Sequence, residues 1–126
     1  MEALKTRALQ FLEQAKFAAE RGFAELALFN IEQYVQLYVK YLLYRRVGDF
    51  PKTHYVRDLF DRLLAVYGDV CNLKAFAERW RTFMAVLEYV YVASRYLPYR
   101  ARQEDVDVAM RFVEEFSEVG RCLETS

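Results

Sequence analysis

The chain has 126 residues, which is enough for one domain that buries most of the surface an unfolded chain exposes. Hydrophobic residues make up 55% of it and aromatic residues 17%, whereas only four glycines and two prolines are available for turns. An all-β fold needs more turn residues, so the composition predicts long helices. The 18 basic and 18 acidic residues balance, which excludes a strong overall field toward nucleic acid or an anionic membrane.

The first two predicted helices cover about residues 3–21 and 23–47. In the first, apolar residues recur every three or four positions until Gly22 ends the pattern. The apolar face of the second helix is about twice as wide as the stripe of roughly 100° that a surface helix shows. Its polar side chains fall in one narrow arc: Glu25, Glu32, Gln33, Gln36 and Lys40. Charges at two of these positions would each cost roughly 2.5–3.5 kcal/mol in a bilayer centre, so we expect a central bundle helix, or one shared with a partner chain.

Three further helices follow a break at residues 48–52, where a proline disfavours helical geometry at the residue before it. The third is expected from an N-cap at Thr53 to about Gly68, the fourth over residues 72–96, and the fifth over residues 103–123. Five helices joined by short connections predict an all-α, antiparallel four- to five-helix up-and-down bundle.

Signatures of metal, cofactor or nucleophile chemistry are missing. Cys71 and Cys122 stand far apart and there is one histidine, so a zinc site is not expected, and the two cysteines are interpreted as buried free thiols in a reducing compartment. The acidic residues are interpreted as solvated charges on helix faces. Residues 1–5 do not resemble the start of a signal peptide, so we expect a cytoplasmic protein without membrane contact. Because the cofactor signatures are missing, no cofactor is expected.

The segment 94–102 carries three arginines and two tyrosines with no acid among them. Arginine with interleaved aromatic residues can hold a phosphate and stack a base, which makes Arg95, Tyr96, Arg100 and Arg102 candidate ligand-binding residues. The alternative is C-terminal capping of the preceding helix by cations. Capping is the favoured interpretation for Arg100 and Arg102, and for Arg95 the two interpretations stay open.

His54 is the only histidine and lies at the start of the third predicted helix. A lone histidine more often packs or caps than catalyses, and no orienting acid stands near it in the sequence. If the protein has catalytic residues, the candidates are therefore Arg95 and His54.

The order of these segments resembles the HEPN domain (higher eukaryotes and prokaryotes nucleotide-binding) over nearly the whole chain, which is then a single domain of residues 1–126. The matching stretches are residues 8–15, 27–43, 54–59 and 94–96. The resemblance implies a helical bundle that dimerises and is often encoded beside a small nucleotidyltransferase as a toxin–antitoxin pair. Many members cleave RNA without metal, using an arginine followed after four to six residues by a histidine, with two copies meeting across the dimer.

This chain departs from that pattern at two places. Arg95 matches the arginine, but Arg100, Ala101 and Arg102 stand where the histidine would, and no histidine follows. Gln36 occupies a position where members commonly carry glutamate. RNA cleavage by the usual mechanism is therefore not expected.

The leading hypothesis is a homodimeric nucleotide- or RNA-binding component of a toxin–antitoxin-type pair with a nucleotidyltransferase. The Arg95 region and the Gln36 and Lys40 side chains would face the ligand or partner, and the excess apolar surface of the second helix would be covered by a second copy. Two alternatives stay open. One is a metal-independent ribonuclease toxin in which His54 or a second arginine replaces the missing histidine, and the other is a purely structural dimerisation module.

Overall fold

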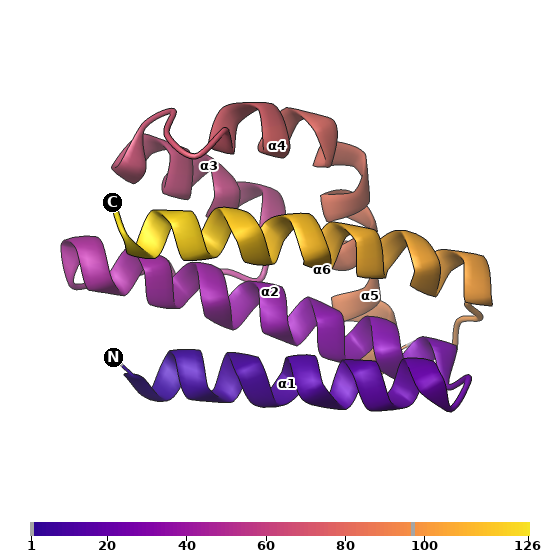
Figure 1. Cartoon of the computed structure of the whole chain (residues 1–126). Coiled ribbons are helices and arrows are strands. Elements are labelled where there is room, and N and C mark those ends of the chain that lie inside the picture. Colours follow the sequence, from indigo (N-terminus) through magenta and orange to yellow (C-terminus); the bar gives the residue numbers. More distant parts are fainter. Residues whose placement is uncertain (1, 97) are drawn as a thin grey trace.

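The computed structural model describes residues 2–96 and 98–126, and within them the chain forms six helices and no strand (Figure 1). The helices are α1 (Glu2–Glu20), α2 (Ala24–Val47), α3 (Val56–Tyr67), α4 (Leu73–Arg79), α5 (Arg81–Tyr96) and α6 (Gln103–Glu124). The predicted all-α bundle is confirmed. No described helix has both the length and the apolar character needed to cross a membrane.

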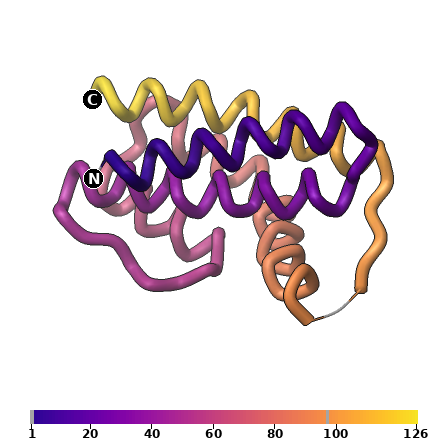
Figure 2. Tube along the Cα trace, turned by 90° about the horizontal axis from the view of Figure 1, so that it is seen from below, coloured from indigo at the N-terminus to yellow at the C-terminus, as the bar shows by residue number. Residues whose placement is uncertain are grey.

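The helices α1, α2 and α6 run side by side along the length of the molecule, whereas α5 crosses their direction steeply (Figures 1 and 2). The helix α2 packs against α1, α3, α5 and α6, and so it is the central helix. The two ends of the chain lie at the same end of the molecule in both views. There, Lys5 of α1 and Tyr38 of α2 both donate hydrogen bonds to Glu124 of α6, at 2.7 and 2.5 Å.

Most of the apolar surface of α2 is covered within one protomer, although Leu26 and Val47 are 50% and 53% exposed, and the expectation that a second copy covers the buried part is wrong. Large side chains on several sides of this helix are fully or nearly fully buried: Ile31, Tyr34, Tyr38, Leu42 and Leu43. Four neighbouring helices from the same chain do this. The large hydrophobic side chains that remain exposed include a group on α5, namely Val86, Tyr89, Val92 and Tyr96.

The single helix predicted over residues 72–96 is two helices, which meet at Trp80. No proline or glycine stands at this point, so packing against α6 decides the bend. The Trp80 side chain is 9% exposed, packs edge-on against Phe112 and donates through Nε1 to Glu115 at 3.0 Å. The predicted N-cap of the third helix is also displaced, because that helix begins at Val56 with Tyr55 as its N-cap residue.

The two cysteines form a disulfide, and the expectation of buried free thiols is wrong. Cys71 lies in the connection between α3 and α4, and Cys122 lies on an exposed face in the last turns of α6. Their Cα atoms are 5.9 Å apart although 51 positions separate them in the sequence. The path of the chain over the end of α6 brings them together, and spacing in the sequence carries no sign of that path.

Candidate functional site

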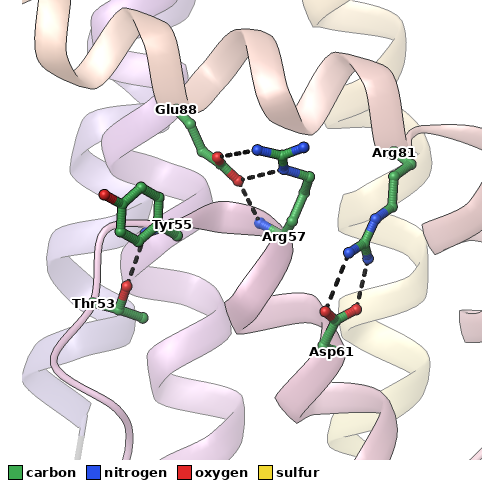
Figure 3. A network of polar contacts seen from close by, with 6 residues as sticks. All are labelled: Thr53, Tyr55, Arg57, Asp61, Arg81 and Glu88. Carbon is green, nitrogen blue, oxygen red and sulfur yellow. Dashed lines mark hydrogen bonds and ion pairs between the residues drawn. The ribbon is translucent and has the colours of Figure 1, made fainter.

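The start of α3 is fixed against the middle of α5 by Glu88 and Arg57 (Figure 3). Glu88 accepts hydrogen bonds from Nε, Nη2 and the backbone N–H of Arg57, at 3.0, 2.8 and 2.9 Å. Burial opposes ionisation of Glu88, but these bonds outweigh it and lower the pKa of its carboxyl group. A second pair, Arg81 with Asp61, joins the same two helices at the surface. This attachment positions the residues that precede α3.

His54 is thereby stacked on Tyr91 of α5. The two ring centres are 4.2 Å apart and the ring planes differ by 11°. One helical turn further along α5, the guanidinium carbon of Arg95 lies 4.4 Å from the centre of the same Tyr91 ring, in a cation–π arrangement. The two candidate residues, distant in sequence, therefore contact one aromatic side chain. We call His54, Tyr91 and Arg95 the Arg95 site.

A row of polar side chains on α2 lies one helical turn apart: Glu32, Gln36 and Lys40, which we call the Glu32 row. The amide of Gln36 donates to a carboxylate oxygen of Glu32, and its own oxygen accepts from Lys40 Nζ at 3.3 Å. The other carboxylate oxygen of Glu32 accepts from Gln33 at 2.6 Å. Glu32 has no exposed surface and Gln36 is 6% exposed. The candidate Gln36 thus links Lys40 to Glu32.

The interpretation of the acidic residues as solvated charges is wrong for Glu32 and Glu88, which are 0% and 7% exposed. Burial raises the pKa of Glu32 to about 7, although the hydrogen bonds from the two glutamines and the charges of Arg95 and Lys40 act in the opposite direction. Burial lowers the pKa of Lys40, with the charge of Glu32 opposing it. The effect of the Arg95 charge on the pKa of Glu32 connects the Arg95 site with the Glu32 row.

The other candidates in segment 94–102 lie elsewhere. Arg102 occupies the N-cap position of α6, where its backbone N–H donates to Asp105 at 2.8 Å, so it does not cap the preceding helix. Arg100 lines a mainly apolar pocket of about 330 Å³ beside α5 and α6. Tyr96 is 76% exposed at the end of α5. Leu97, within the same segment, lies outside the described residues.

Glu25 fixes the segment that carries Arg100, so that Arg100 lies apart from the Arg95 site. It binds the segment at two points, because its backbone oxygen accepts from Tyr99 Oη at 3.0 Å and its carboxylate accepts from the Ala101 N–H at 2.6 Å. The bond from Ala101 lowers the pKa of Glu25. The segment is thus held against the start of α2, which is far along that helix from Lys40.

Three residues of this region were not predicted as functional. Glu32 was placed in the polar arc but assigned to solvent, and Tyr91 and Glu88 were not singled out. The spacing of Glu32, Gln36 and Lys40 carried a usable signal, because one polar row on an otherwise apolar helix must meet polar partners or water. Among the described residues, no three His, Cys, Asp or Glu side chains gather as a metal site would require.

The fold and the site define an all-α bundle protein in which cations and aromatic rings meet where α5 crosses α2. A family model described as HEPN domain matches residues 1–123, and the chain therefore belongs to the HEPN domain family. No curated protein and no solved structure matches the chain. The family resemblance seen in the sequence is confirmed.

Proposed function

We propose that this HEPN-domain protein binds a phosphate-bearing ligand, a nucleotide or RNA, at the Arg95 site, with Lys40 as a second cation. The observation that carries the proposal is the exposed guanidinium of Arg95 over the Tyr91 ring, which also holds His54. Among the described residues Arg95 is in no ion pair, so its planar donor group is free for the bidentate hydrogen bonds that phosphate accepts. The exposed ring of Tyr96, the next residue in the chain, suits stacking of a base.

A homodimer and a nucleotidyltransferase partner belong to the same proposal. The exposed apolar group on α5 adjoins Arg95 in sequence, and three of its members offer a surface for a second copy: Val86, Tyr89 and Val92. A twofold contact through this surface would set two Arg95 sites near one another. The nucleotidyltransferase partner and the toxin–antitoxin pairing rest on family membership alone.

We do not propose RNA cleavage by the usual mechanism, because no histidine follows Arg95 in the sequence. One observation does favour a ribonuclease as the second candidate. His54 and Arg95 contact the same Tyr91 ring within one protomer, so an imidazole and a phosphate-binding cation stand together. These are the two groups that metal-independent cleavage of a phosphodiester needs.

The binding proposal is tested by titration calorimetry with ATP and with a short single-stranded RNA. Arg95→Ala is expected to weaken binding about tenfold to a hundredfold, because hydrogen bonds to a charged group contribute about 1.5–3 kcal/mol. Arg100→Ala is the matched control, since it removes an exposed arginine five positions away that lines a different pocket, and we expect less than a twofold change. Equal losses in both variants would place the ligand elsewhere. Absence of binding by a stable dimer would favour the purely structural module.

A cleavage assay in the presence of a chelator separates the two candidate functions. We expect no degradation of RNA by the wild-type protein or by Arg95→Ala. Cleavage that is lost in both Arg95→Ala and His54→Gln would establish the ribonuclease instead. Sedimentation of the wild type and of Tyr89→Glu tests the dimer, and a change from dimer to monomer is the expected result.

A further inference from the structure

Glu32 is the most deeply buried acidic side chain near the proposed ligand, and its hydrogen bonds come from amides. Its carboxylate has no exposed surface and accepts from Gln33 and Gln36. Among the described residues it forms no ion pair, although Arg95 and Lys40 both act on it. A buried carboxylate without a direct cation partner is held in its charged form only weakly.

We propose that Glu32 takes up a proton from solvent when an anion binds to Arg95 and Lys40, so that the site admits the anion and one proton together. This inference rests on the proposed function, since it concerns how the same cations respond to a ligand. The step is a simple protonation, in which the carboxylate of Glu32 becomes a neutral carboxyl group and no other bond forms or breaks.

The hydrogen-bonded row provides the physical route for this coupling. Lys40 Nζ donates to the Gln36 oxygen at 3.3 Å, and the Gln36 amide donates to Glu32. The charges of Lys40 and Arg95 favour the ionised form of Glu32 while the site is empty. A bound anion offsets those positive charges and adds a negative one nearby, and both effects favour the neutral carboxyl group.

Other charged groups packed against α2 have partners of their own. Glu124 of α6 accepts from Lys5 of α1 and from Tyr38, and the charge of Arg121 of α6 acts on Tyr34 and Tyr38. The charges on α3 nearest to α5 are those of Arg57 and Asp61, and they are paired with Glu88 and Arg81. The charges that lower the pKa of Glu32 are those of Arg95 from α5 and Lys40 from α2. His54, in the segment before α3, is the remaining titratable group of the site and requires a control.

The test is the affinity for a short oligoadenylate, measured by fluorescence anisotropy between pH 6 and pH 8. Its phosphodiesters and bases keep one charge state over this range, so any slope belongs to the protein. If ligand binding raises the pKa of Glu32 by one or two units, proton linkage predicts that Kd increases about five- to tenfold from pH 6 to pH 8. Glu32→Gln, which is neutral throughout, is expected to lose this slope.

Glu88→Gln, which removes a buried glutamate outside the site, is the matched control and is expected to keep the slope, and His54→Gln shows how much of the slope comes from the imidazole on Tyr91. A slope retained in Glu32→Gln and lost in His54→Gln would assign the proton to His54 and overturn the inference. In the wild type, ¹³C NMR of the glutamate carboxyl groups gives a direct readout that needs no variant to fold. We expect the Glu32 resonance to titrate at higher pH with oligoadenylate than without it, and an unchanged midpoint overturns the inference. Binding with a flat wild-type profile overturns only the proton uptake, whereas absence of binding overturns the proposed function as well.

Discussion

Replacement of Glu32 by glutamine is expected to stabilise the folded protein at neutral and alkaline pH. The pKa of this carboxyl group is 4.5 in the unfolded reference and about 7 in the folded protein, where burial disfavours the charge. The folded state therefore binds the proton more tightly. As pH rises from about 4.5 to 7, the wild type loses stability, because the unfolded chain ionises freely and the folded chain does not.

The size of the effect follows from the difference between the two pKa values. Each pKa unit corresponds to about 1.4 kcal/mol, so the free energy of unfolding of the wild type is lowered by about 3 kcal/mol at pH 8. Glutamine has nearly the same shape and stays neutral. The free energies of unfolding of Glu32→Gln and the wild type are expected to be similar near pH 4.5 and to differ by about 3 kcal/mol at pH 8, with the variant more stable.

Urea unfolding followed by circular dichroism at several pH values measures this difference. Glu88→Gln is the matched control, because Glu88 is also buried but Arg57 lowers its pKa. For Glu88 the sign is reversed, and the variant is expected to be less stable than the wild type at pH 7, with the difference shrinking as the pH falls through the lowered folded pKa. A loss of stability in Glu32→Gln at pH 8 would refute the reasoning, since it would mean that Arg95 and Lys40 more than compensate for burial.

Two further changes test the packing. The double substitution of Cys71 and Cys122 by serine is expected to lower the free energy of unfolding by about 4 kcal/mol, because the disulfide closes a loop of 51 positions; denaturant unfolding measures it, and a loss below about 1 kcal/mol would contradict the cross-link. Gly120→Ala places a Cβ 2.5 Å from the ring of Tyr38, which is 3% exposed and has no room to move. A cost of about 1–3 kcal/mol is expected from thermal unfolding, and an unchanged melting temperature would show that the ring can shift.

The sequence alone determined most of the secondary structure, because helical periodicity acts over a few neighbouring positions, but it showed neither the division at Trp80 nor the start of α3 at Val56. The all-α fold, the central place of the second helix and the polar row of Glu32, Gln36 and Lys40 were all readable at that range. The family was readable from the order of short segments, and with it the choice of Arg95. These features depend on residues close together in the chain.

The tertiary structure decided which other residues these side chains contact. The bend at Trp80 turns α5 across α2, and this crossing places Arg95 near Glu32 and Tyr91 against His54. The same folding path joins the two cysteines and covers the apolar sides of α2 with helices of its own chain. Such contacts link residues separated by tens of positions, and their geometry depends on helix crossing angles set by side-chain packing rather than by the local pattern. For this reason the sequence identified the components of the site, and only the packing of α5 on α2 and the start of α3 brought them together.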